Sequence, residues 1–271
     1  MKDLDFIQVG DLAREIAAAG ATPVGDLAGT SVELSFENGE RTRYTFADAQ
    51  ELQWESEGPD GRRSGSESYW ALSPRPGIYF VDYVGRERPT TSVSLVLDRE
   101  AGVATQLTGT LPTRDRVRTG AFDLASAGLD LTFVEAEFRN ANLDGPFDAS
   151  GPHHQPTAEM AGHRVQYTYG PTESYEHIYL NEKLYTWQCL SGIEKGLADT
   201  DRCHAYKIAD ELYLFVWREK IVPTLGVVMA DWQQMRSQGK LFGYESDDFG
   251  ATTNVCIVSK AHLLNVTTYV R

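Results

Sequence analysis

The chain has 271 residues, more than one domain usually has, and two modules of about 130 residues each fit the common domain size better. Hydrophobic residues make up 41% of the sequence, enough to build proper cores, and no run of about 18 apolar residues could span a bilayer. The formal net charge of −14 argues against nucleic acid and membrane surfaces as partners and leaves a small aromatic or conjugated ligand open.

The N-terminus and the cysteines indicate a reducing compartment. The opening stretch MKDLDFIQVG places Asp3 and Asp5 where a signal peptide needs basic and then apolar residues. Three cysteines without a CxxC spacing argue against both a disulfide framework and a structural zinc site: Cys189, Cys203 and Cys256. We therefore expect a cytoplasmic protein. The sequence leaves its oligomeric state open, with a homodimer as one option.

One amphipathic helix is expected near the start of the chain, followed by β-strands. Residues 11–19 have apolar side chains at helical spacing between Asp11, a suitable N-cap, and Gly20, a stop. Beyond it, short stretches rich in Val, Thr, Tyr and Phe are separated by turn-forming pairs such as Asn38-Gly39, which predicts antiparallel hairpins. Two stretches without periodicity are interpreted as a flexible hairpin tip and a linker: residues 58–66 and 140–156.

The sequence contains one module twice. Three parts of the first half return in order, 133 to 134 residues later: LAGTSV (27–32) as MAGHRV (160–165), Trp54 as Trp187, and GIYFVDY (77–83) as ELYLFVW (211–217). Each copy has about eight short strands, which suits a barrel or a sandwich, and we favour the barrel because closure removes both sheet edges. The expected fold is all-β, divided into a helix with lead-in, a first barrel, a linker and a second barrel: residues 1–24, 25–139, 140–158 and 159–271.

Strand 211–219 carries the first candidate for chemistry. Every second residue shares one face, which carries Tyr213, Phe215, Trp217 and Glu219. If that face points into the barrel, Glu219 ends a row of rings, and desolvation raises its pKa toward the range used in proton transfer. The pattern makes Glu219 a candidate general acid or base, with Phe215 and Trp217 as substrate-binding neighbours.

Two other strands supply hydroxyl and amide groups. Strand 163–169 places Tyr167 and Tyr169 on one face, where their hydroxyls can bind a phenolate or carboxylate together. On strand 184–190, Gln188 adds a neutral donor and acceptor if the even-numbered residues face inward. The expected substrate-binding set is completed by two residues that precede this strand: His177 and Tyr179.

The same residues also have an ordinary interpretation. Tyrosine and tryptophan are frequent in strands and fill cores, and Glu219 at a strand end could lie in water. The duplication helps to decide, because the first copy lacks the tyrosine pair and the glutamate and has in their places Leu34, Phe36 and Gly85. The apolar framework recurs while the polar set appears once, so folding alone does not require that set. We therefore place the site in the second copy.

No metal and no nucleotide cofactor is predicted. The six histidines are scattered, and His153-His154 has no HxxxH or HxH partner. Neither GxGxxG nor GxxxxGK[ST] occurs. Cys189 has no basic neighbour to lower its pKa, so we expect a buried inert thiol. The loop 191–202 is either a lid or an ordinary solvated loop.

Long stretches of the chain resemble the MoaF family, whose name stands for molybdenum cofactor biosynthesis protein F. They are YEHIYLNEKLYTWQCLSGIEKGLADTDR, ELYLFVWREKIVPTLGVV and GKLFGYESDDFG in the second half, and LAGTSVELSFENG and RPGIYFVDY in the first. The resemblance covers nearly the whole chain after the first helix. The family name implies a link to molybdopterin.

The second half is similar, more distantly, to phenolic acid decarboxylases, which are single lipocalin-like (calycin) barrels that work without a cofactor. Their V-Y-T-Y strand resembles residues 165–169 (VQYTY), and their K-I-S-W-T-E strand resembles residues 215–219 (FVWRE). By this resemblance the tyrosine pair and Glu219 form the active centre. The family's arginine aligns with Gln188, which argues against a carboxylic acid substrate because arginine is the bidentate carboxylate binder.

Together, the residues and the resemblance favour a tandem lipocalin-like double barrel. Its C-terminal barrel would perform cofactor-independent acid–base chemistry, of lyase, hydratase or isomerase type, on a small phenolic or conjugated molecule. Two other functions stay open: a non-catalytic small-molecule-binding protein, and an accessory factor in molybdenum cofactor biosynthesis.

Overall fold

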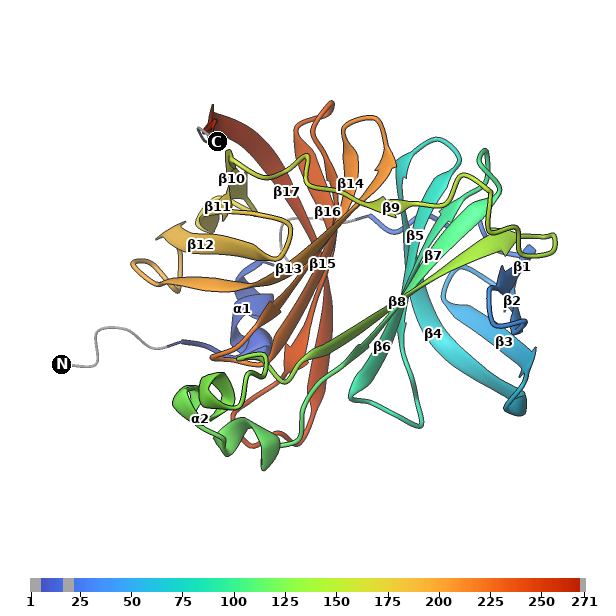
Figure 1. Cartoon of the computed structure of the whole chain (residues 1–271), viewed down its shortest axis with the longest axis horizontal. Coiled ribbons are helices and arrows are strands. Elements are labelled where there is room, and N and C mark those ends of the chain that lie inside the picture. The colour runs from blue at the N-terminus through green and yellow to red at the C-terminus, as the bar shows by residue number, and fades with distance from the viewer. Residues whose placement is uncertain (1–5, 17–21, 269–271) are drawn as a thin grey trace. The chain divides into compact units, whose positions relative to one another are not determined.

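A computed structural model describes residues 6–16 and 22–268 of the chain (Figure 1). The chain is mostly β and forms two closed eight-stranded antiparallel barrels in tandem with a short N-terminal helix, which confirms the predicted fold class. Its two compact units are not contiguous in sequence. One unit comprises residues 22–110 and 136–155; the other comprises the N-terminal helix, residues 111–135 and the second barrel. The helix and the segment 111–135 therefore belong with the second barrel, unlike in the expected division.

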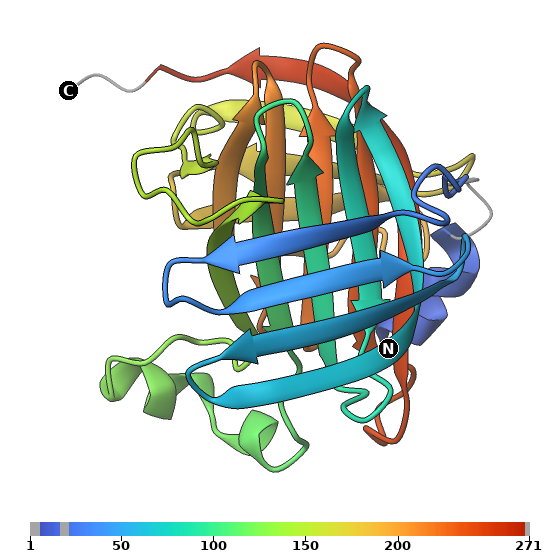
Figure 2. The same cartoon turned by 90° about the vertical axis from the view of Figure 1, so that its right-hand side faces the viewer.

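The first barrel closes between its first and last strands (Figure 2). Each strand pairs with the next one along the chain, and β8 returns to β1, where Leu143 lies opposite Leu34. Because successive side chains of a strand point to opposite faces, one set of apolar residues fills the interior. The strands are β1 (Ser31–Phe36), β2 (Arg41–Phe46), β3 (Glu51–Gly58), β4 (Gly61–Arg75), β5 (Ile78–Val84), β6 (Thr91–Asp98), β7 (Val103–Thr110) and β8 (Glu135–Leu143).

Two local predictions in this unit have different outcomes. The Asn38-Gly39 turn joins β1 to β2, with Gly39 in the left-handed region at a φ of 84°, which confirms the hairpin. The hairpin predicted at residues 58–66 is confirmed, but its tip is shorter than expected, because β3 and β4 pair up to Gly58 and Gly61 and leave only residues 59–60 as the turn. The cross-strand ladder satisfies these backbone groups despite the glycines and serines. Similarly, the expected linker begins as strand, since β8 continues to Leu143.

The second barrel repeats this design with β10 to β17. Each strand again pairs with the next, and β17 returns to β10, where Ala261 lies opposite Tyr167. A two-residue strand, β9 (Gln155–Pro156), precedes it. The strands of the barrel are β10 (His163–Thr168), β11 (Ser174–Tyr179), β12 (Leu184–Ser191), β13 (Ala198–Ala209), β14 (Leu212–Glu219), β15 (Thr224–Asp231), β16 (Arg236–Tyr244) and β17 (Thr252–Val266).

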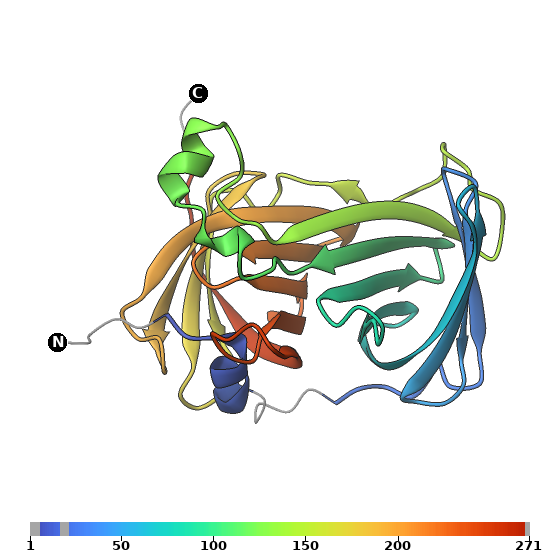
Figure 3. The same ribbon diagram turned by 90° about the horizontal axis from the view of Figure 1, so that it is seen from below.

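Helix α1 (Val9–Ile16) packs on β16 and β17 of the second barrel (Figure 3). It begins two residues before the predicted start, so Asp11 lies inside the first turn rather than at the N-cap; the predicted end at Gly20 lies outside the described residues. The approach is close, because a methyl group on Gly10 would come within 2.3 Å of the backbone oxygen of Glu245. A second helix, α2 (Ala121–Ser126), and a 3₁₀ turn (Arg116–Arg118) lie in the segment 111–135. Neither helix among the described residues has the length and apolar character needed to cross a membrane.

Replacing Gly10 by alanine is expected to weaken the docking of α1. The added methyl group forces the helix away from β16, and such overpacking costs about 1–3 kcal/mol of unfolding free energy, more than the gain of up to about 1 kcal/mol in helix propensity. Urea titration of both proteins measures the difference. Gly25→Ala is the control, since a methyl group there makes only an ordinary 3.6 Å contact with Ala49. A Gly10→Ala variant as stable as its parent would contradict the close packing.

Candidate functional site

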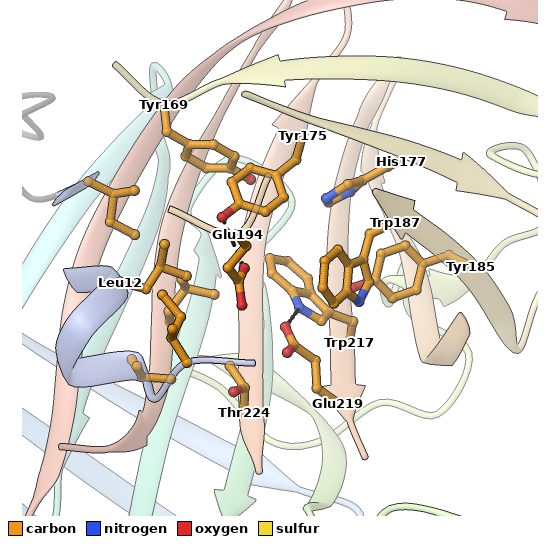
Figure 4. A pocket seen from close by; sticks show the side chains of 14 residues that line it. Leu12, Tyr169, Tyr175, His177, Tyr185, Trp187, Glu194, Trp217, Glu219 and Thr224 are labelled. Carbon is orange, nitrogen blue, oxygen red and sulfur yellow. Dashed lines mark hydrogen bonds between the residues drawn. The ribbon is translucent and has the colours of Figure 1, made fainter. Parts of the chain in front are cut away.

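A cavity of about 50 Å³ lies inside the second barrel and is bounded by α1 (Figure 4). This space is enough for on the order of four water molecules at ~10–15 Å³ each. Six rings, two carboxyl groups and the apolar side chains of the N-terminal segment form most of its wall: Tyr169, Tyr175, His177, Tyr185, Trp187 and Trp217; Glu194 and Glu219; Ile7, Val9, Leu12 and Ile16.

Glu219 ends the row of inward-facing rings on β14, as the alternation of that strand predicts. Its carboxylate accepts a hydrogen bond of 2.9 Å from Nε1 of Trp217, whose indole lies over Gly226 on the neighbouring strand. Although part of the residue reaches solvent, burial of the carboxyl group raises its pKa well above the usual range, and the nearby carboxylates of Asp201 and Glu194 raise it further. These surroundings therefore favour the protonated form of Glu219.

The tyrosine pair is divided between the cavity and the core behind it. Tyr169 lines the cavity, and burial raises its pKa. The hydroxyl of Tyr167 instead lies 2.8 Å from that of Tyr179 and accepts a 3.3 Å hydrogen bond from Nε1 of Trp232. Both of these hydroxyls are occupied by core contacts. The structure therefore offers Tyr169, rather than a tyrosine clamp, to a ligand.

Gln188 does not face the cavity, and this expectation was wrong. The odd-numbered residues of β12 point inward, and the amide of Gln188 donates a hydrogen bond to Glu176 on the opposite face. The reason is the relative burial of the two faces, since Tyr185, Trp187 and Cys189 together bury far more apolar area than their even-numbered neighbours. The inward thiol of Cys189 is buried, which raises its pKa and agrees with the predicted inert thiol.

The remaining predicted residues lie in one aromatic cluster. His177 lines the cavity among the rings, is only 5% exposed, and its Nδ1 has no hydrogen-bond partner among the described residues. Burial lowers its pKa to about 3, so the imidazole is neutral. Phe215 stacks on Trp217 with ring centroids 5.7 Å apart, and Tyr179 packs edge-on against Phe215 at 4.9 Å. Trp217 and His177 thus contact the cavity directly, while Phe215 and Tyr179 support them.

The structure adds polar residues that were not predicted from the sequence. Glu194 lies in the loop after β12 and accepts a 3.0 Å hydrogen bond from the hydroxyl of Tyr175. Asp201 accepts a 3.0 Å hydrogen bond from Nε1 of Trp187 and also contacts Lys220. Burial raises the pKa of both carboxyl groups. Within the described ranges, no three His, Cys, Asp or Glu side chains are grouped as a metal site would need.

The first barrel shows which of these contacts belong to the scaffold. Trp54 donates to Glu67 at 3.4 Å, as Trp187 does to Asp201, and the paired strand positions correspond. This indole–carboxylate contact is thus present in both copies. Four polar residues of the cavity wall have no polar counterpart of the same type in the first copy. The second copy has Tyr169, Tyr175, Tyr185 and Glu219, and the first has in these places Phe36, Thr42, Leu52 and Gly85.

Replacing His177 by phenylalanine is expected to reduce the loss of stability in acid. The folded pKa of about 3 lies below the unfolded value, so the unfolded chain takes up this proton first, and stability falls as the pH drops below 6.5. The slope from this residue is about 1.4 kcal/mol per pH unit between roughly pH 6 and 3. Urea titrations of both proteins from pH 4 to about 7 compare the slopes. The buried residues His154 and His204 contribute equally in both proteins and cancel in the comparison. Equal slopes in the two proteins would show that the imidazole of His177 is not kept neutral by the fold.

Comparison with known proteins covers both halves of the chain. The model of the MoaF N-terminal domain matches residues 4–113, and that of the MoaF C-terminal domain matches residues 154–267. Protein MoaF of Klebsiella aerogenes is 43% identical over 270 residues, which cover 97% of this chain and 96% of the relative. A Burkholderia vietnamiensis structure with a provisional β-lactamase name is 11% identical over 39% of this chain and 95% of its own, with a TM-score of 0.34, too low to support an argument. The chain belongs to the MoaF family.

Proposed function

We propose that the C-terminal barrel binds a small conjugated molecule and acts on it by cofactor-independent acid–base chemistry, with Glu219 as the group that moves the proton. The observation that supports this most is the position of Glu219, whose carboxyl group ends a row of rings at the cavity and is hydrogen-bonded to an indole. Carboxyl groups with a raised pKa in apolar surroundings are suited to donate a proton at neutral pH.

The surroundings of Glu219 suit a reaction through an enolate or phenolate. Its protonated carboxyl group donates a proton to one carbon of the conjugated system, and the resulting carboxylate removes a proton from another atom of the same molecule or from an added water, so that Glu219 is protonated again at the end of the turnover. The Tyr169 hydroxyl, which also lines the cavity, donates a hydrogen bond to the developing oxyanion. Lyase, hydratase and isomerase reactions share this proton movement.

The charges around the cavity argue against a carboxylic acid as substrate. No lysine or arginine belongs to its wall among the described residues, whereas Glu194 and Glu219 do. The resemblance to phenolic acid decarboxylases led to the same conclusion, because their arginine corresponds to Gln188. Because Gln188 lies on the outer face, its amide cannot bind a substrate carboxylate in the cavity either.

Binding without chemistry is the alternative that a specific observation favours. The wall of the cavity is mostly aromatic and apolar, with side chains of α1 such as Leu12 and Ile16 at its boundary, and a wall of this composition suits binding alone as well as catalysis. A role as an accessory factor in molybdenum cofactor biosynthesis rests on the family name rather than on a feature of the cavity.

Glu219→Gln separates catalysis from binding. With a panel of phenols, hydroxycinnamates and pterins, we expect the variant to retain binding and to lose turnover by about 100-fold or more, the usual contribution of a general acid or base. Calorimetry measures binding, and chromatography of the products measures turnover. Glu67→Gln is the matched control, since it alters the indole-bound carboxyl group of the first barrel.

Three outcomes have distinct meanings. Turnover that is lost in Glu219→Gln and kept in Glu67→Gln supports the enzyme. A ligand that the wild-type protein binds and leaves unchanged supports a binding protein instead. If no compound binds, or if turnover is unaffected by Glu219→Gln, the proposed site is wrong.

A further inference from the structure

We propose that the ligand of this cavity carries a positive charge, as a small ammonium group attached to the conjugated part of the molecule. This inference rests on the proposed function only in taking the cavity as the ligand site, and it narrows the class of ligand. It is based on three features of the wall: the faces of the rings, the uncompensated carboxyl groups and one unsatisfied imidazole nitrogen.

The rings surround the cavity from several strands, as an aromatic cage does. Tyr175 packs edge-on against Tyr169, with centroids 5.9 Å apart, and lies 6.2 Å from Trp187. On the other side, Tyr185 lies 6.1 Å from Trp217. The faces of tyrosine and tryptophan attract cations, and the attraction grows when water is excluded, so cages of this composition bind ammonium groups.

The carboxyl groups of the wall have no cation of their own. Glu194 is bound by the hydroxyl of Tyr175 and Glu219 by the indole of Trp217, and neither forms an ion pair with any described residue. Lys220, which follows Glu219 in the chain, is directed to Asp199 and Asp201 instead. Two buried acids beside a cavity disfavour an anionic ligand and favour a cationic one, which allows them to ionise.

His177 supplies the second, independent indication of a ligand. Figure 4 shows its ring among the aromatic side chains of the wall. The imidazole is buried and neutral, and its Nδ1 has no hydrogen-bond partner within residues 6–16 and 22–268. A buried polar atom without a partner is unfavourable. In the tautomer with the proton on Nε2, Nδ1 is an acceptor, and a ligand that offers an N–H group satisfies it. An ammonium group provides both that donor and the positive charge.

The first barrel lacks this combination. Where the second barrel has Tyr175, Tyr185 and Glu219, the first has Thr42, Leu52 and Gly85. Two rings and one acid of the cage are therefore missing from an otherwise similar scaffold. The cation site is a property of the second copy alone.

A pair of probes that differ in charge tests the inference. Benzylammonium and benzyl alcohol have the same ring and nearly the same size, and benzoate adds the opposite charge. In each probe only the end group is small enough for the space between the rings of the wall, and the benzene ring is expected at the open side of the cavity. By calorimetry on the full chain at neutral pH, we expect benzylammonium to bind about tenfold more tightly than benzyl alcohol, the size of a desolvated cation–π contribution, and benzoate not to bind. Tetramethylammonium serves as a smaller cationic probe.

Two variants locate the effect. Glu219→Gln should weaken benzylammonium about tenfold and leave benzyl alcohol unchanged, since glutamine keeps the shape of the side chain but cannot ionise when the cation binds. Glu67→Gln, in the first barrel, should change neither. Thermal unfolding of each variant verifies that it is folded, and Trp217→Leu replaces Glu219→Gln if that variant is not, because it removes a ring of the cage.

The results distinguish this inference from the proposed function. Tighter binding of the cation that depends on Glu219 supports the inference. If the alcohol binds as well as the cation, or if benzoate binds best, the cation site is wrong while the cavity remains a ligand site. If none of the four probes binds, the cation site is likewise wrong, and turnover of the phenol and pterin panel then decides separately on the proposed function.

Discussion

The carboxyl group of Glu219 lies at the end of a row of rings and has an indole N–H as its hydrogen-bond partner. A carboxylate in such surroundings is poorly solvated, so the group keeps its proton and its pKa rises. The neighbouring acids, Glu194 and Asp201, add to this effect because each further negative charge opposes ionisation. The chemistry available to the second barrel follows from this constraint, since a neutral carboxyl group can donate a proton where a carboxylate could not.

The duplication allows scaffold and site to be separated within one chain. An indole–carboxylate hydrogen bond links β3 to β4 in the first barrel and β12 to β13 in the second. Because both copies have it, Asp201 is explained by the architecture and not by a ligand. Glu219 and Tyr185 have no such explanation, since Gly85 and Leu52 occupy their positions in a barrel that closes equally well.

Alternation and repetition explain how much of this could be predicted from the sequence. The inward position of Glu219 followed from β14, where one face carries the large rings, and the barrel followed from eight short strands in each copy. Which face of β12 points into the barrel was not predictable. Both faces of this strand contain apolar residues, one of them the face of Gln188 and the other that of Cys189, so only the packing of the interior decides between them. Glu194 was missed since a loop has no periodicity from which its direction could be read.

The surface on which α1 packs could not be predicted from the local sequence either. Its amphipathic pattern predicts a helix with one apolar face but not the surface that this face covers. The structure places the face against β16 and β17, so that Leu12 and Ile16 complete the wall around the buried acids. Exclusion of water there strengthens the desolvation that raises the pKa of Glu219. The buried carboxyl group of Glu219 and the unsatisfied imidazole of His177 both reduce stability, and the first copy, which has Gly85 and Tyr44 at these positions, demonstrates that the barrel does not need them. Their presence in one copy only is what a ligand site, rather than a folding requirement, would produce.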